Sequence, residues 1–351
     1  MSKSIKKGLT RRDALRTTGA AAAAGAVITG FPALTRSAQQ KKFLKPIVAG
    51  LNGKPGDPSY VSVSEVPRIL AEKYDIEVKF EVHHSSTLGT DLSQLEAVQT
   101  GFIDISSNVT SQFSKFDDSF AFVDLPYIIT SWDQYLQVAK GNAWKQQAAK
   151  FESKVPVKVL PPVGAGGFRL LWNNVRALPD ASKVDGLKFR TVTSPIAIEL
   201  IKSWGGNPTS IPWTEVYTAL QQGVVQGFHV QPIWTYKFNM YEVLKYATEV
   251  KAVFGIQFQV MNINTWNAIP ESIQGPMMMA FQEAADIGNQ ADRDSEDGYK
   301  DKLREKGMEI YTPSAKEFAE WRSRGEGIWN KVGVGSSIDK GLVDSVAKLR
   351  S

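Results

Sequence analysis

Residues 186–227 read GLKFRTVTSPIAIELIKSWGGNPTSIPWTEVYTALQQGVVQG, and this stretch decides the fold class. Its first part, 187–192, has the composition of a buried strand. A helix follows at once, because Ser194 offers a capping hydroxyl in front of Pro195, which suits the first helical position. The glycine pair at 205–206 ends this helix. A strand that leads directly into a capped helix is typical of α/β proteins.

The same alternation continues along the chain. A second helix is expected over 214–222, capped by Thr214 and ended by Gly223. Further strands are expected at 46–51, 76–82, 157–160 and 256–263. From Glu271 to Lys306 the pattern stays helical, broken mainly at Gly275–Pro276. A helix of this length can brace two lobes, and the chain is expected to pass between the lobes more than once.

The N-terminus has the layout of a secretory signal, with a basic stretch, an uncharged run over 19–34 and a short polar exit ending near Ala38. The pair Arg11–Arg12 is typical of twin-arginine export. A short membrane anchor is the alternative, but the run is shorter than the roughly 20 apolar residues that span a bilayer. We therefore expect a signal peptide at 1–38 and a mature protein that works in the periplasm without inserting into a membrane.

Removal of this segment changes the charge of the protein. The whole chain has a formal net charge of +5, but residues 1–38 contain seven of its 41 Lys and Arg residues and one of its 36 Asp and Glu residues. The mature protein is therefore nearly neutral, which argues against nucleic acid as a partner. The chain has no cysteine, which excludes disulfides, thiolate metal sites and a lipid-modified cysteine.

No catalytic or cofactor motif stands out. The stretch GAGG at 164–167 lacks the spacing of a dinucleotide loop, so a turn at a crossing between lobes is expected there. The stretch GKP at 53–55 lacks the hydroxyl with which a phosphate loop holds magnesium. Of the three histidines, His83 and His84 would point to opposite faces of a strand. We expect no cofactor and no metal site.

Two arginines are candidates for binding an anion. Arg190 ends the strand at 187–192, beside the helix that starts at Ser194, and Arg169 lies in GFRLLW at 167–172. A guanidinium offers a planar fork of donors that matches a carboxylate, and a helix N-terminus adds donors and positive potential. Pairing with a surface acid is the alternative role for each arginine.

Aromatic residues gather in the same part of the chain. They are Phe168, Trp172, Trp213, Tyr217, Phe228, Trp234 and Tyr236. Small-ligand pockets often combine aromatic walls with a few fixed polar groups. Most of these side chains are expected in the core, and Trp213 and Trp234 are the candidates for the wall of a site.

Several ordered blocks resemble one family of binding proteins. The stretch IPWTEVYTALQQGVVQG (211–227), continued by YEVLKY (241–246), resembles the signature of the DctP-type solute-binding proteins of tripartite ATP-independent periplasmic (TRAP) transporters. Three other blocks match in order and spacing: STLGTDLSQLEAVQTGFIDI (86–105), FVDLPY (122–127) and GLKFR (186–190). The resemblance covers residues 43–332.

This resemblance implies a two-lobed α/β periplasmic binding protein with its ligand cleft between the lobes and a long bracing helix. The lobes are expected at 39–163 and 164–250, with 251–351 returning to both. The resemblance also implies a monomer that binds a small organic acid and delivers it to a TRAP membrane transporter. Arg190 matches the arginine that binds the substrate carboxylate in this family. Arg169 matches a second arginine that often faces the ligand.

One loop departs from the family pattern. Members usually continue VDGQENP, whereas this chain reads VQGFHVQP at 225–232. An ungapped match puts Val230 where the ligand-contacting asparagine would be. Gln231, after a shift of one residue, and His229 are the alternative contacts. Because the two candidate tryptophans flank this loop, a flatter or more apolar acid than a simple dicarboxylate is expected.

Two other functions stay open on the sequence alone. Twin-arginine export often carries proteins that fold around a cofactor, which keeps a periplasmic cofactor- or metal-dependent enzyme as an alternative. A receptor that presents its ligand to a signalling protein would use the same binding chemistry as a transport receptor.

Overall fold

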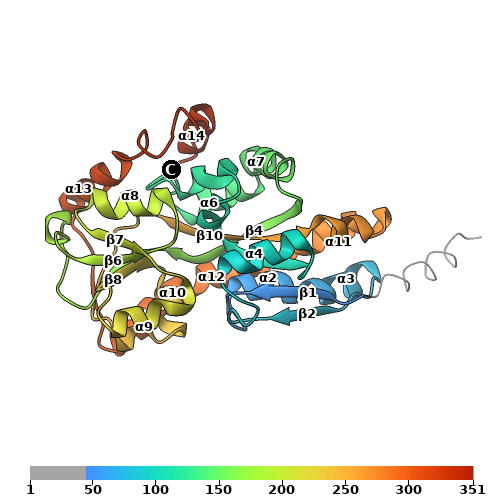
Figure 1. Cartoon of the computed structure of the whole chain (residues 1–351), viewed down its shortest axis with the longest axis horizontal. Coiled ribbons are helices and arrows are strands. Elements are labelled where there is room, and N and C mark those ends of the chain that lie inside the picture. Colours follow the sequence, from blue (N-terminus) through green and yellow to red (C-terminus); the bar gives the residue numbers. More distant parts are fainter. Residues whose placement is uncertain (1–44, 351) are drawn as a thin grey trace, which may run out of the picture. The chain divides into compact units, whose positions relative to one another are not determined.

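Two β-sheets organise residues 45–350, the part of the chain that this computed structural model describes (Figure 1). The expected signal peptide at 1–38 lies outside the described residues. The first sheet has the strand order β2-β1-β3-β10-β4. Its strands are β1 (Ile47–Leu51), β2 (Phe80–His83), β3 (Ile105–Val109), β4 (Val157–Phe168) and β10 (Phe254–Asn262). β1 pairs in parallel with β2 and β3, whereas β10 is antiparallel to β3 and β4.

The second sheet has the strand order β11-β9-β5-β8-β6-β7. Its strands are β5 (Leu170–Asn173), β6 (Lys188–Thr191), β7 (Asn207–Ser210), β8 (Gly227–Val230), β9 (Tyr246–Thr248) and β11 (Glu309–Tyr311). β6 is parallel to both β7 and β8, and β5 is antiparallel to β8 and β9. In chain order, the first sheet contributes β1 to β4, the second β5 to β9, the first β10 and the second β11, so the chain passes between the sheets three times.

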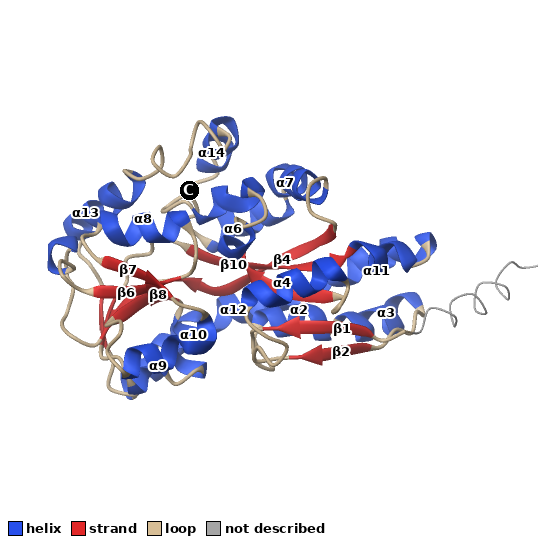
Figure 2. Cartoon of the chain, in the orientation of Figure 1, coloured by secondary structure: helices blue, strands red, loops and turns tan. Residues whose placement is uncertain are grey.

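Helices pack around both sheets (Figure 2). They are α2 (Pro58–Ser64), α3 (Val66–Tyr74), α4 (Asp91–Thr100), α5 (Thr110–Phe113), α6 (Trp132–Lys140), α7 (Asn142–Glu152), α8 (Pro195–Ser203), α9 (Val216–Gln221), α10 (Pro232–Lys237), α11 (Ile263–Ala268), α12 (Glu271–Glu305), α13 (Ala315–Glu326) and α14 (Lys340–Ala347). None of these helices combines the length and the apolar character needed to cross a bilayer.

The long helix α12 is a single 35-residue element that packs on α2, α3 and β4 of one half and on α10 and β11 of the other. The expected break at Gly275–Pro276 is wrong, because Pro276 lies inside the helix. Proline removes one backbone hydrogen bond and crowds the preceding turn. Ile273 and Met277, on either side of it, are fully buried under the first sheet, and this packing keeps the helix continuous.

The local predictions for 186–227 are confirmed in the first helix and only partly in the second. The Ser194 hydroxyl caps α8 by accepting a bond from the backbone N–H of Ala197. The second helix starts later than predicted, since 213–215 form a 3₁₀ turn and α9 begins at Val216 without a side-chain cap. The strand expected at 76–82 also starts late, at Phe80.

The glycine stretch at 164–167 is not the turn that the sequence suggested, because it lies within β4. Gly166 and Gly167 have φ values of +103° and +71°, a backbone conformation that is strained for residues other than glycine. A Cβ atom on Gly167 would lie 2.3 Å from the carboxylate of Glu296 on α12. The chain leaves the first sheet here and enters the second at β5, so the bend is made by glycines in an extended strand packed against α12.

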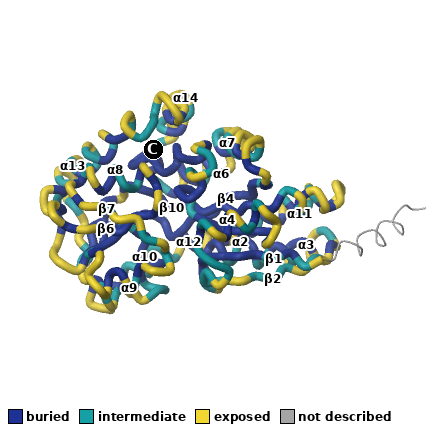
Figure 3. Tube along the Cα trace, in the orientation of Figure 1, coloured by how far each residue is buried: buried dark blue, intermediate teal, exposed yellow. Residues whose placement is uncertain are grey.

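Three clusters of buried apolar side chains hold these elements together, and in Figure 3 most strands are buried along most of their length, whereas the edge strands β2, β7 and β11 are not. One cluster joins the first sheet to α2, α3 and α12, and a second joins the second sheet to α9 and α10. The largest cluster includes residues from both sheets, among them Phe254 and Phe189. The predicted aromatic residues Trp172 and Phe228 are fully buried in the second cluster and are therefore core residues.

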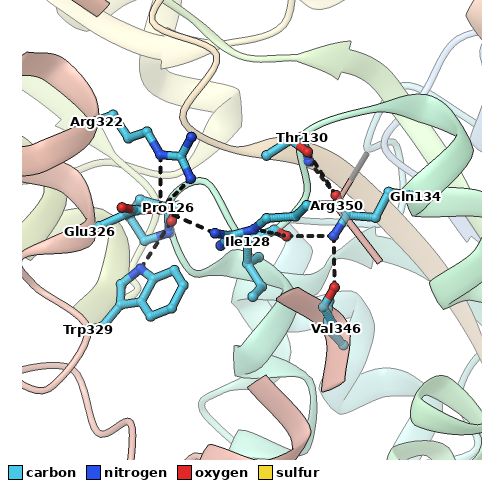
Figure 4. Close-up of polar contacts among 9 residues, drawn as sticks. All are labelled: Pro126, Ile128, Thr130, Gln134, Arg322, Glu326, Trp329, Val346 and Arg350. Carbon is cyan, nitrogen blue, oxygen red and sulfur yellow. Dashed lines mark hydrogen bonds and ion pairs between the residues drawn. The ribbon is translucent and has the colours of Figure 1, made fainter. Parts of the chain in front are cut away.

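The C-terminal segment joins distant parts of the chain (Figure 4). Trp329 donates through its indole nitrogen to the carbonyl oxygen of Pro126, at 3.0 Å. Gln134 donates to the carbonyl oxygen of Val346, also at 3.0 Å. Trp321 on α13 donates to the carbonyl oxygen of Pro179, beyond β5. This segment therefore contacts both the loop before α6 and the loop that follows β5.

Candidate functional site

A cavity opens between the two sheets and encloses about 470 Å³ of space, its mouth included. Its first wall comes from the first sheet and α4: Asn52, Asp91, Val109 and Gln257. Its second wall comes from the second sheet and its connections: Arg169, Arg190, Val192, Trp213, His229, Val230, Gln231 and Trp234. All six residues predicted from the sequence therefore lie together, although 65 positions separate the first from the last.

Arg190 is on β6 and is only 4% exposed. Its Nε donates to the carbonyl oxygen of Ile211 at 2.8 Å, and its guanidinium lies 5.7 Å from the ring centre of Trp213. Within residues 45–350, no acceptor binds its two terminal nitrogens. Burial lowers the pKa of Arg190 to about 10, and the charge of Asp91 opposes this shift. The group stays charged near neutral pH, oriented by Ile211 and open toward the cavity.

Arg169 lies between β4 and β5 and is 8% exposed. Its backbone N–H donates to the carbonyl oxygen of Val253, which fixes the chain at the crossing between the sheets. Its Nε is buried without a partner among the described residues. Burial lowers its pKa, while the charge of Asp124 opposes this shift. Burial also raises the pKa of Asp124 to about 6, although Thr110 donates to this carboxylate at 2.6 Å.

A smaller chamber adjoins the cavity and shares Arg169 and His229 with it. Asp124 and Ser194 line this chamber. The sequence suggested that the N-terminus of α8 lies beside Arg190. In the structure, Ser194 and the first turn of α8 open onto the chamber that contains Arg169.

Two tryptophans form an aromatic wall. The rings of Trp213 and Trp234 meet edge to face with centres 6.1 Å apart, and Phe238 packs against both. The indole nitrogen of Trp234 donates to the carbonyl oxygen of Ala165 at 2.6 Å, so this ring is fixed. The indole nitrogen of Trp213 is buried without a partner among the described residues. It is therefore a donor available to a bound molecule.

The stretch after Gly227 that departs from the family pattern is not a loop but strand β8 followed by the start of α10, and it places three consecutive residues on the cavity: His229, Val230 and Gln231. Burial and the charge of Arg169 lower the pKa of His229 well below its ordinary value, so the imidazole is neutral. The His229 Nε2 and the Gln231 Nε2 are both buried without a partner in the described chain. His229 and Gln231 were the two alternative ligand contacts suggested by the sequence. Both line the cavity, so the geometry does not favour one over the other.

The sequence reasoning missed the wall that the first sheet provides. Asp91 is the first residue of α4, which Thr90 caps, and Gln257 lies on β10. Asp91 and the hydroxyl cap could have been found, because Thr90–Asp91 follows Gly89 within the family-like block at 86–105. Gln257 carries no such signal. Within the described part of the chain, no three His, Asp or Glu side chains are grouped to hold a metal ion.

The family is decided by a match along most of the chain. Residues 49–334 match the DctP family, described as bacterial extracellular solute-binding protein, family 7. The chain belongs to this family. The resemblance seen in the sequence is thereby confirmed, together with the α/β binding-protein fold. Members of this family are receptors that bind solutes and are not enzymes, so the enzyme alternative has no support.

Individual relatives are distant. An uncharacterised protein of Sinorhizobium fredii is 29% identical over 245 residues, which are 70% of this chain and 43% of that protein, so the chain spans less than half of its length. The C4-dicarboxylate-binding periplasmic protein DctP of Rhodobacter capsulatus is 28% identical, over 72% of this chain and 76% of that protein. A TRAP periplasmic solute-binding protein of Sulfurospirillum deleyianum, solved with bound succinate, superposes with a TM-score of 0.81 at 22% identity, covering 87% of this chain and 99% of that one.

Proposed function

We propose that this protein is a periplasmic receptor that binds a small organic acid in the cavity between its sheets and delivers it to a TRAP-type membrane transporter. The observation that carries the proposal is the buried, oriented guanidinium of Arg190 in a chain of the DctP family. Relatives described as binding C4-dicarboxylate or succinate support an organic acid as the ligand class.

Arg190 is suited to hold the carboxylate. Its Nε is already used by Ile211, so the plane of the guanidinium is set before a ligand arrives and little rotamer freedom is lost on binding. Its two terminal nitrogens can then donate in parallel to both oxygens of one carboxylate. Arg169 and the indole nitrogen of Trp213 are further donors on the same wall.

The cavity draws its lining from both sheets, so a ligand that contacts both walls stabilises the arrangement in which they are close. Such a ligand shifts the population toward this closed arrangement by the difference between its affinities for the two states. Contacts between α2 and α10 favour the same arrangement. Lys237 forms an ion pair with the buried Asp57, and Lys54 donates to the carbonyl oxygen of Lys237 at 2.6 Å. The transporter would recognise the closed form.

The rest of the lining suggests an acid with an apolar or flat body. Val109, Val192 and Val230 line the cavity beside the two tryptophans. Export by the twin-arginine signal at 1–38 would bring the receptor to the periplasm, where we expect it to act as a monomer. Nucleic acid is not proposed as a partner.

The test of this function is the loss of carboxylate binding in Arg190→Ala. Two charge-assisted hydrogen bonds, each of about 1.5 kcal/mol or more, correspond to an affinity loss of about 100-fold or more in titration calorimetry. Circular dichroism checks that the variant is folded. The exposed Arg68, which pairs with Glu65 on the surface of α3, supplies the control variant Arg68→Ala, expected to bind normally. Unchanged affinity in Arg190→Ala would refute the proposal.

Native mass spectrometry of the protein as purified is an independent test. A carried-over ligand would be released by denaturation and identified by its mass. A carboxylic acid is expected, and a ligand without any acidic group would count against the function.

A further inference from the structure

The two walls of the cavity differ in chemistry. The wall from the second sheet presents hydrogen-bond donors: Arg190, Arg169 and the indole nitrogen of Trp213. The wall from the first sheet presents two acceptors, because Asp91 and Gln257 each have a buried side-chain oxygen without a partner in the described chain, and the Gln257 amide also carries a donor. A molecule that satisfies both walls must carry a carboxylate to accept from the donors of the second-sheet wall. It must also carry hydrogen-bond donors for the acceptors of the first-sheet wall.

Asp91 is the decisive acceptor. It is 8% exposed, and its Oδ2 accepts a hydrogen bond from Gln112 at 3.2 Å, while its Oδ1 is buried without a partner. No lysine or arginine nitrogen of residues 45–350 lies within 4 Å of this carboxylate. Buried polar atoms in native proteins are almost always hydrogen-bonded, so an unpartnered carboxylate oxygen on a cavity wall indicates a donor on the ligand.

Asp91 also lies in the electrostatic range of the carboxylate site. Its charge opposes the shift that burial imposes on Arg190, and Arg190 acts in the same way on Asp91. Asp91 and Arg190 line the same cavity from opposite walls, so the atoms attached to a carboxylate bound to Arg190 extend toward the wall that holds Asp91. At that place a hydroxyl or an ammonium group would donate to Oδ1, whereas a second carboxylate would meet a like charge.

The charges around the cavity argue against two carboxylates. Two arginines, Arg190 and Arg169, line the cavity together with one carboxylate, Asp91, and a second carboxylate, Asp124, lines the adjoining chamber with Arg169. No third cation is among the residues that line the cavity. The remaining lining is apolar and aromatic, so a second ionised group would have no partner to replace its water.

We propose that the solute is a monocarboxylate with a hydroxyl or ammonium group on the carbon next to the carboxylate, and that Asp91 selects it over dicarboxylates. This inference rests on the proposed function, because it assumes that a carboxylate binds at Arg190. It differs from the C4-dicarboxylate and the succinate named for the two relatives described above.

Two matched series of acids test the inference. Each contains a parent monocarboxylate (3-methylbutanoate or 3-phenylpropanoate), its 2-hydroxy and 2-amino derivatives, and a dicarboxylate of similar size (methylsuccinate or phenylsuccinate). Affinities are measured by thermal shift and titration calorimetry on the wild type and on Asp91→Asn. The control is Asp133→Asn, which changes an exposed aspartate in the first turn of α6.

In the better-bound series, the wild type is expected to bind a 2-hydroxy or 2-amino acid at least tenfold more tightly than the parent acid, and the dicarboxylate more weakly than the parent. The two derivatives separate a hydroxyl from an ammonium donor. Asp91→Asn is expected to reduce the preference for the 2-amino acid at least tenfold and to improve dicarboxylate binding, while Asp133→Asn leaves the ranking unchanged.

Wild-type protein that prefers the dicarboxylate, or an Asp91→Asn variant with the wild-type ranking, would overturn the inference and leave the proposed function intact. If Asp91→Asn does not fold, the order of the acids' affinities for the wild-type protein is sufficient to test the inference. If no acid of either series stabilises the wild type, the inference fails, and the proposed function is decided separately by native mass spectrometry and by Arg190→Ala.

Discussion

Asp292 on α12 is expected to make the stability of the protein depend on pH. It is 1% exposed, and its Oδ2 accepts a hydrogen bond from the backbone N–H of Gly166 at 2.7 Å. Its Oδ1 is buried without a partner in the described chain. Burial is the main reason that its pKa rises to about 7, and the charges of Glu296 and Asp57 act in the same direction. The perturbation that we consider is Asp292→Asn.

The sign follows from the two states of the wild type. An aspartate in an unfolded chain has a pKa near 3.8, so between pH 4 and 7 the folded protein keeps a proton that the unfolded chain has lost. The stability that this proton provides is fully present below pH 4 and is lost as the pH rises through 7. At about 1.4 kcal/mol for each pKa unit, the difference between about 7 and 3.8 corresponds to about 4 kcal/mol.

Asparagine cannot ionise, so the variant does not lose stability at this position as the pH rises. Its side-chain oxygen can still accept from Gly166, and any cost of its unpartnered NH₂ group is the same at every pH. The free energy of unfolding of Asp292→Asn, minus that of the wild type, should therefore increase by up to about 4 kcal/mol between pH 4 and pH 8.

Urea denaturation followed by circular dichroism, repeated at several pH values from 4 to 8.5, measures this difference. Asp286→Asn is the matched control, because Asp286 lies on the same helix and its partly exposed carboxylate pairs with Lys140 on the surface. A difference between Asp292→Asn and the wild type that stays constant with pH would refute the reasoning.

Two further predictions concern packing and the contact between α2 and α10. Gly227→Ala should destabilise the protein by more than about 2 kcal/mol, because the new Cβ would lie 2.0 Å from a backbone oxygen of β5. Gly275 lies in α12, and a Cβ atom added to it would have no neighbouring atom within 4 Å, so Gly275→Ala should stabilise the protein by up to about 1 kcal/mol. Equal effects of the two glycine substitutions in urea denaturation would contradict this account. Lys237→Met should lower the stability by about 2 kcal/mol in the same assay, because it leaves the buried Asp57 without its ion-pair partner; an unchanged denaturation midpoint would show that the pair contributes nothing.

Features that depend on neighbours a few residues apart were predictable. The cap at Ser194 and the glycine at 205 define the ends of α8 through contacts within one turn, and the structure has both. The late start of α9 and the continuous α12 differ from the prediction for the opposite reason. Whether Pro276 ends a helix depends on the burial of Ile273 and Met277 against a distant sheet, which no local pattern records.

The ligand site shows the same division. The amino-acid sequence alone was sufficient to identify the family, through several ordered blocks, and to select Arg190, Arg169 and the aromatic pair as candidates. It contained no sign that Asp91 would face Arg190 across a cavity, because the two residues are about 100 positions apart, Asp91 on α4 beside the first sheet and Arg190 on a strand of the second. Only the packing of the two sheets brings an unpartnered acceptor opposite a cluster of donors. That juxtaposition, which depends on tertiary contacts, narrows the expected ligand from an organic acid to a particular kind of monocarboxylate.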